Sequence, residues 1–193
     1  MRKVLLIAAL SLLGIATLPA QRIDGFWKAD EAFRKAFELD DDELNMDFIV
    51  HFDKEEKASK KDKEKGAVVL AMPINSTDDE IGTLGVVFAL PGTYVRTGSS
   101  VTATFNKDDV DIKITEMHLL DKEVAALIES SEESWNAIAA LIEAQVKENN
   151  AKDMENIAGL ADLFKAFTIE SVTKDRLVIA IGEDTITFDR YEE

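Results

Sequence analysis

The fold class follows from residues 167–191, FTIESVTKDRLVIAIGEDTITFDRY. This stretch holds three short runs rich in apolar and β-branched residues, at 167–173, 176–181 and 185–191. Such runs are typical of β-strands with a buried face. Only two or three residues separate one run from the next, and connections that short join antiparallel strands. The end of the chain is therefore predicted to be an antiparallel meander of three strands.

Earlier parts of the chain predict more strands of the same kind. These runs lie at residues 23–28, 46–52, 66–74, 82–90, 101–105 and 110–115. Pro73 is expected to end the third of these strands and Pro91 the fourth, because proline cannot donate a ladder hydrogen bond. Eight or nine short antiparallel strands must close into a barrel or stack as a sandwich to avoid exposed edges. The chain is thus predicted to be mainly β, with these two architectures open.

Two regions are predicted to be helical instead. Asp30 is a suitable N-cap for a short helix over residues 30–39, in which Phe33 and Phe37 lie one turn apart. A longer helical region covers about residues 121–165, where apolar residues such as Trp135 recur at helical spacing. A one-sided helix must bury its apolar side. This insertion is therefore expected to pack on the body of the domain, with a partner-binding face as the alternative.

Motifs at the two ends of the chain resemble those of one family. A Gly25-x-Trp27 motif lies on the first strand, Gly92-x-Tyr94 precedes a turn and a strand, and Arg190 lies on the last strand. Together they resemble the lipocalin-like (calycin) β-barrels, above all the small exported lipocalin-like proteins of bacteria, which also carry a short helix after the Trp strand. The resemblance implies a closed, up-and-down antiparallel barrel of eight or nine strands. It also implies that Trp27 closes the barrel floor with Arg190 across its indole, a cation–π contact of roughly 0.5–2 kcal/mol.

A cavity for a small hydrophobic ligand is also implied by the resemblance, and ligand binding is the first functional hypothesis. The candidate lining consists of residues expected on the inner face: Phe48, Val50, Phe88, Phe105, Ile112, Ile114, Ile179 and Phe188. Glu116 and His118 continue the parity of Ile112 and Ile114, so they are expected at the mouth as polar groups that orient a ligand. The alternative is that this strand has already left the barrel and that both side chains are solvated.

A protein-interaction module is the second hypothesis. An eight-stranded barrel is just wide enough for side chains or for one small ligand, so large inward aromatic residues fill it completely. The working surface would then be the helices and the acidic loops, and an acidic face suits a basic partner protein. The sequence leaves the choice between an open and a filled interior undecided.

Charge and composition exclude several functions. The 193 residues include 38 acidic and 22 basic ones, a net charge of −16. Nucleic acid is not expected as a partner, because binding phosphates requires a basic face, and an anionic lipid surface is disfavoured for the same reason. With no Cys, two His and no phosphate-binding or nucleophile motif, no enzyme activity, cofactor or metal centre is expected. The acidic runs at 40–43 and 108–111 do not match a calcium loop and are interpreted as solvated turns.

Residues 1–20 match a secretory signal peptide. Arg2 and Lys3 precede an apolar run, and Ala20 provides a small residue at the expected cleavage site. Cleavage would leave a single domain, residues 21–193, with a net charge of −18, because Arg2 and Lys3 are the only charged residues removed. The protein is expected to be exported to the periplasm or out of the cell, with no membrane span after cleavage. An uncleaved N-terminal anchor is the alternative.

Overall fold

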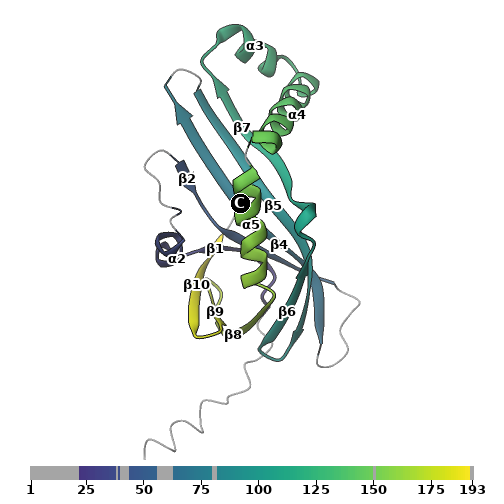
Figure 1. The fold of residues 1–193 in the computed structure, drawn as a ribbon, viewed down its shortest axis with the longest axis vertical. Coiled ribbons are helices and arrows are strands. Elements are labelled where there is room, and N and C mark those ends of the chain that lie inside the picture. Colours follow the sequence, from purple (N-terminus) through teal and green to yellow (C-terminus); the bar gives the residue numbers. More distant parts are fainter. Residues whose placement is uncertain are drawn as a thin grey trace, which may run out of the picture.

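The structure is a computed structural model that describes residues 22–37, 39, 44–55, 63–79, 82–149 and 151–191. The predicted signal peptide, residues 1–20, and the acidic run at 40–43 lie outside these residues. Figure 1 shows a β-barrel at one end, a long sheet extension that rises from it, and helices beside and beyond that extension. Among the described helices, none combines the length and the apolar character needed to span a membrane.

Eight antiparallel strands close into the barrel. Around the ring they are β1 (Gly25–Ala29), β3 (Ile49–Lys54), β4 (Glu64–Asp78), β5 (Gly82–Thr97), β6 (Ser100–Phe105), β8 (Ala166–Val172), β9 (Arg176–Ile181) and β10 (Asp184–Tyr191). The last strand, β10, pairs with β1 and closes the ring. The predicted mainly-β barrel is therefore confirmed and the sandwich is excluded. The three final strands begin and end within one residue of their predicted bounds.

The strands β4 and β5 are much longer than the barrel needs, with 15 and 16 residues. Their outer parts pair with each other and leave the ring. Two further strands lie beside them, β2 (Leu44–Met46) on β4 and β7 (Asp111–Leu119) on β5. We call β2, β7 and the outer parts of β4 and β5 the extension. It gives the molecule its length in Figure 1.

Pro73 and Pro91 lie inside β4 and β5, so the prediction that they end these strands is wrong. The reason is that each long strand changes its neighbour at its proline. Pairing of β4 with β3 ends at Ala71 and pairing with β2 begins at Ile74, while β5 pairs with β7 up to Ala89 and with β6 from Gly92. Each proline therefore lies where one side of its strand has no ladder partner, and the missing N–H leaves no ladder bond unmade there.

Both predicted helical regions are present. In the first, α2 (Glu31–Ala36) follows β1, and the carboxylate of Asp30 accepts a hydrogen bond from the backbone N–H of Phe33 at 3.0 Å, as expected of an N-cap. The second region consists of α3 (Lys122–Ser130), α4 (Glu132–Asn149) and α5 (Ala151–Leu163). A short 3-10 turn, η1 (Lys107–Asp109), lies between β6 and β7.

The three helices of the insertion occupy different places. Both α3 and α4 pack against β7 at the outer end of the extension, and we call this pair the helical arm. By contrast, α5 lies along β4 and β5 and leads the chain back to the barrel at β8 (Figure 1). Buried residues of the barrel, the extension, α5 and the arm belong to one hydrophobic core.

Candidate functional site

The barrel interior is occupied by aromatic side chains that contact one another. Phe48 precedes β3, Phe188 lies on β10, and Phe164 follows the last turn of α5. The ring of Phe164 lies 5.3 Å from that of Phe48 and 6.2 Å from that of Phe188, measured between centroids, and all three residues are at most 2% exposed. These distances are those of directly packed aromatic pairs. Phe48 and Phe188 also lie 6.4 Å apart, so a residue of the insertion packs together with two residues of the barrel.

The contacts continue on both sides of Phe164. At the end of the barrel where α2 follows β1, Phe33 of α2 packs on Phe48 with 5.2 Å between the ring centroids. Toward the other end, Phe167 lies 6.2 Å from both Phe164 and Phe52, and Phe52 meets Tyr94 edge-on at 5.3 Å. We call these residues the aromatic series: Phe33, Phe48, Phe52, Tyr94, Phe164, Phe167 and Phe188. A continuous series of packed aromatic side chains therefore runs through the described interior.

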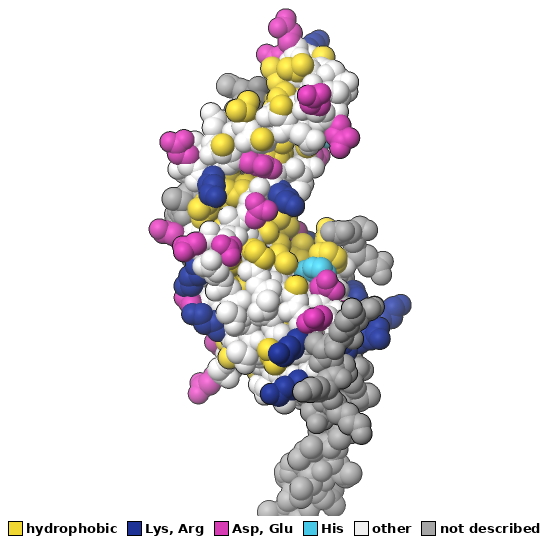
Figure 2. All heavy atoms as spheres, turned by 90° about the vertical axis from the view of Figure 1, so that its right-hand side faces the viewer, with side chains coloured by type: hydrophobic (Ala, Val, Ile, Leu, Met, Phe, Trp, Pro, Cys, Tyr) yellow, Lys and Arg dark blue, Asp and Glu magenta, His cyan; other side chains and the backbone are white. Residues whose placement is uncertain are grey.

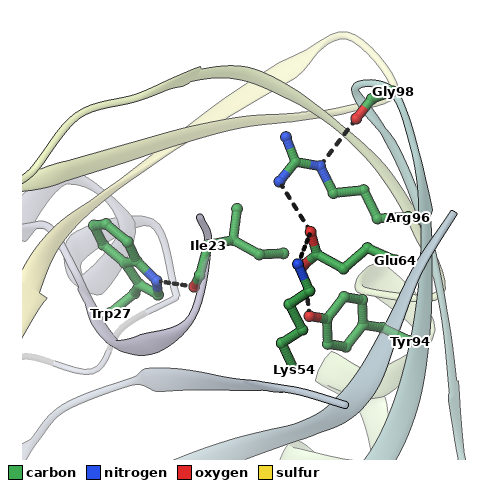
Figure 3. Close-up of polar contacts among 7 residues, drawn as sticks. All are labelled: Ile23, Trp27, Lys54, Glu64, Tyr94, Arg96 and Gly98. Carbon is green, nitrogen blue, oxygen red and sulfur yellow. Dashed lines mark hydrogen bonds and ion pairs between the residues drawn. The ribbon is translucent and has the colours of Figure 1, made fainter. Parts of the chain in front are cut away.

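Trp27 and Arg190 lie together at the opposite end of the barrel from α2, in the arrangement that the resemblance to lipocalin-like barrels implies. The guanidinium carbon of Arg190 lies 4.7 Å from the centre of the indole, and its Nη1 donates a hydrogen bond to the carbonyl oxygen of Asp24 at 2.6 Å. The indole N–H donates to the carbonyl oxygen of Ile23 at 2.7 Å (Figure 3). Gly25 has a φ of +110°, and a Cβ there would clash with the guanidinium of Arg190. The glycine of the Gly-x-Trp motif is thus required by both its backbone and its neighbour.

A polar cluster around Glu64 lies near this closed end. Figure 3 shows Tyr94, Arg96 and Lys54 converging on the Glu64 carboxylate. The Tyr94 hydroxyl donates a hydrogen bond to it at 2.8 Å, and the cations of Arg96 and Lys54 lie 3.8 and 3.9 Å away. Burial, reinforced by the bond to Glu64, raises the pKa of Tyr94 above its usual range, so the phenol stays protonated. This cluster joins β3, β4 and β5 at the barrel end.

Four predicted lining residues belong to the barrel and are fully buried there: Phe48, Val50, Ile179 and Phe188. Phe105 ends β6 and is partly buried against the core. The sequence pattern placed these residues on the inner face, but it gave no sign that Phe164 lies between them. Phe164 belongs to an apolar helical stripe, and such a stripe shows that a side chain is buried without showing against what.

Phe88, Ile112 and Ile114 are buried in the extension instead of the barrel wall. Phe88 pairs with Ile112, and Ile114 pairs with Val86, in the part of β5 that lies beyond the ring. Because β7 is not a barrel strand, the predicted position of Ile112 and Ile114 in the barrel wall is wrong. Their buried face is covered by the insertion, whose helices α3 and α4 pack on β7.

The predicted inward direction of Glu116 and His118 is also wrong. The pairing of β5 with β7 shifts register between Gly85 and Val86, which leaves Thr115 as an extra residue on β7. This β-bulge reverses the parity of the strand after it. Met117 is consequently buried, whereas Glu116 and His118 are exposed. The Nε2 atom of His118 lies 3.3 Å from the Oε1 atom of Glu116. The alternative of solvated side chains on a strand outside the barrel holds for both residues.

The helical arm carries the most exposed large apolar residues of the described chain. Leu120, just ahead of α3, is 58% exposed, Leu127 of α3 is 53% exposed, and Leu141 of α4 is 69% exposed. Val124 lies one turn before Leu127 and is 36% exposed. Both helices of the arm are anchored, since Ile128 of α3 and Ala139 of α4 are buried in the core. Figure 2 shows hydrophobic and acidic side chains intermixed on this end of the molecule.

Acidic side chains surround these apolar residues. Between residues 120 and 149 the chain has seven acidic residues and two lysines. Ion pairs within the described residues involve carboxylates elsewhere, such as Asp47, Glu64 and Asp162, and none of the arm's seven. One of the seven, Glu143, accepts a hydrogen bond from the backbone N–H of Ile114 on β7 at 3.1 Å. The arm therefore presents a surface of net negative charge, because its seven acidic residues outnumber its two lysines.

Comparison of the chain with protein-family models, with curated proteins and with solved structures finds no match.

Proposed function

We propose that this chain is an exported, non-enzymatic protein-interaction module, in which a lipocalin-like barrel serves as the scaffold and the helical arm contacts a partner protein. One observation carries the proposal. The aromatic series packs through the described barrel interior, whereas Leu127 and Leu141 on the arm and Leu120 just ahead of it remain more than half exposed. Apolar surface accessible to a partner protein is therefore present outside the barrel.

Burial of the exposed leucines would contribute substantially to binding. Fully burying one leucine side chain stabilises a complex by roughly 1.5–3 kcal/mol, and interfaces concentrate their energy in a few such residues. Single exposed leucines are common on protein surfaces and need no explanation. The arm differs because Val124 and Leu127 share a helix face, with Leu120 next to that helix in the chain. Its acidic surroundings add selectivity for a cationic partner.

Photo-crosslinking in the producing cell tests this function. A photoreactive amino acid replaces Leu127 or Leu141 on the arm, and a matched variant carries it at Val95, an exposed apolar residue on the barrel strand β5. We expect a discrete adduct with one other protein from the arm positions and none from Val95. Equal adducts from all three positions, or no adduct from either arm position, would contradict the proposal.

Binding of a small hydrophobic ligand is a second candidate, favoured by the origin of Phe164. The eight strands close without α5, so the side chain of Phe164, which packs against both Phe48 and Phe188, comes from outside the ring. Ion pairs of Asp162 with Lys107 and Lys165 hold the end of α5 near this position. A ligand that displaced Phe164 would find an apolar chamber lined by four of the predicted residues.

Native mass spectrometry of the protein purified from its export compartment, without refolding, tests the second candidate. A small-molecule mass that disappears under denaturing conditions would support ligand binding. The Phe164→Ala variant opens space in the chamber and should retain more of the same molecule. A bare mass for both proteins would remove this candidate.

A further inference from the structure

The exposed face of α3 has the chemistry of a docking surface for one kind of partner. We define the α3 patch as Leu120, Val124 and Leu127, which are 58%, 36% and 53% exposed. Leu127 is three positions after Val124 in α3, and residues with this spacing lie on the same helix face. Ile128, one turn after Val124, is buried in the core and holds the adjoining side of α3 in place. The patch is thus a fixed apolar surface on a helix that is already anchored.

Charge around the α3 patch selects the partner. Glu123 lies one turn before Leu127 on the same face, and Asp121 caps the helix through hydrogen bonds from the N–H groups of Glu123 and Val124 at 2.9 and 3.1 Å. Glu132 and Glu133 begin α4 directly after α3. Lys122 at the start of α3 offsets part of this charge, but the acidic side chains outnumber it, so the surface is complementary to an apolar strip bordered by lysine or arginine.

A second copy of this chain does not satisfy that requirement. A two-fold symmetric contact through the α3 patch would place the same carboxylates opposite one another, on chains that each carry a net charge of −16. Like charges brought together in an interface oppose association. The occupant is therefore expected to be a different protein that supplies the positive charge.

Strand addition is also disfavoured at this end of the molecule. The outer edge of β7 would be the template for an added strand, but two of its N–H groups are already used. The N–H of Ile112 donates to the carboxylate of Asp111 at 3.0 Å, and that of Ile114 donates to Glu143 of α4 at 3.1 Å. A partner helix that packs its side chains against those of α3 is the other mode of recognition. Two helices pack in this way through residues spaced three and four positions apart on each.

We propose that the α3 patch binds a cationic amphipathic helix of a partner protein, whose apolar residues cover Val124 and Leu127 while its lysines or arginines face Glu123 and the acidic start of α4. This inference rests on the interaction function proposed above and names the partner's chemistry. It predicts an association that needs both an apolar stripe and positive charge on the partner.

The probes for the test are three labelled synthetic peptides of 18 residues. The first is a helical lysine–leucine peptide with its leucines on one face, the second has the same composition in a scrambled order, and the third is a glutamate–leucine peptide with the pattern of the first. Binding to the protein purified from its export compartment is measured by fluorescence anisotropy at low and high salt. The double variant Val124→Ser with Leu127→Ser removes the two apolar side chains that the α3 helix contributes to the patch. Val95→Ser is the matched control, because Val95 has the same 36% exposure as Val124 but lies on the barrel.

We expect the amphipathic lysine–leucine peptide to bind, with a Kd at least tenfold lower than that of the scrambled peptide. The double variant should raise this Kd at least tenfold, Val95→Ser should leave it unchanged, and high salt should raise it. Circular dichroism melting of each variant verifies that the fold is retained. Equal binding of the scrambled peptide, tighter binding of the glutamate–leucine peptide, or unchanged binding by the double variant would overturn the inference.

The two proposals fail in different ways. An adduct at Leu127 in the producing cell without affinity for the lysine–leucine peptide would leave the interaction function standing and overturn the cationic-helix partner. Absence of both the adduct and the affinity would overturn the interaction function as well.

Discussion

In the barrel, Phe48, Phe164 and Phe188 contact one another away from solvent, whereas in the helical arm Leu127 and Leu141 keep more than half of their surface exposed. Charges follow the same division. Glu64 at the barrel end is surrounded by Tyr94, Arg96 and Lys54, while the acids of the arm form no ion pair within the described residues. The difference teaches that the densely packed aromatic contacts and the exposed apolar surface belong to separate parts of this molecule, and on the proposed function the second part is the one that recognises a partner. Variants in the two parts should therefore behave differently.

The largest effect is expected from Phe164→Ala. Removing this ring leaves a cavity between Phe48 and Phe188, and a buried phenylalanine replaced by alanine typically lowers the free energy of unfolding by about 3–5 kcal/mol. Chemical denaturation of the purified protein measures the loss. Leu141→Ala removes an exposed side chain of the arm and should change the same quantity by no more than about 0.5 kcal/mol. Similar losses for the two variants would break the comparison.

Gly25→Ala should have the next largest effect. It forces an alanine to a φ of +110° and directs the new methyl group at the guanidinium of Arg190, so we expect a loss of roughly 1–3 kcal/mol. Gly98→Ala is the matched control, since Gly98 also has a positive φ but has open space where its Cβ would be. Thermal melts should show a smaller loss for Gly98→Ala. In an Arg190→Ala background the cost at Gly25 should fall by the part due to the clash and keep the part due to the backbone, and an unchanged cost would show that the guanidinium does not contribute to it.

Two acids should give opposite pH dependences of stability. Burial and the nearby Glu64 carboxylate raise the pKa of Asp24 above 3.8, so its contribution to stability is present below 3.8 and is lost as the pH rises through the raised value. Hydrogen bonds from Lys107 and Lys165 lower the pKa of Asp162 to about 2, so its contribution is present above 3.8 and is lost as the pH falls toward 2.

Unfolding free energies between pH 2 and pH 6 test both signs. As the pH rises, Asp24→Asn should become more stable relative to the unmodified protein, and Asp162→Asn should become less stable relative to it. Parallel curves for the two variants would show that the two carboxylates do not differ in this way.

The smallest effect on stability is expected from Leu127→Ser. Its side chain is more than half exposed, and substitutions at such positions usually change the free energy of unfolding by less than about 0.5 kcal/mol. The melting temperature should therefore stay near that of the unmodified protein. A drop as large as that of Gly25→Ala would show that Leu127 contributes to the arm's own packing, and would weaken its assignment to a binding surface.

Local pattern was sufficient to predict most of the fold. Alternating residues with short connections predicted the final meander, and the cap residue Asp30 predicted the start of α2. The position of Arg190 over Trp27 followed from motifs at the two ends of the chain. These features depend on neighbours in the sequence or on a recognisable family pattern, so the sequence contains their signal.

The errors come from features that depend on distant partners. Pro73 and Pro91 stop a strand in general, but here they lie where β4 and β5 exchange neighbours, and which strands pair is not a local property. The bulge at Thr115 breaks the period-two assumption that placed Glu116 and His118 inward. The burial partners of Phe164 are likewise set by the tertiary fold, because a helical stripe does not show where it will pack.

Pairing of the first barrel strand with the last also constrains how the protein folds. A chain made or exported from its N-terminus presents β1 early, but its partner β10 follows only after the insertion and two further strands. Until then the ring is open, with unpaired strand edges and without the contact of Phe188 to Phe164. Closing a ring between the two ends of a chain is a contact of high sequence separation, which slows folding. The helical insertion between β7 and β8 therefore lengthens the interval in which the ring is open, and transiently unpaired strand edges of this kind favour aggregation.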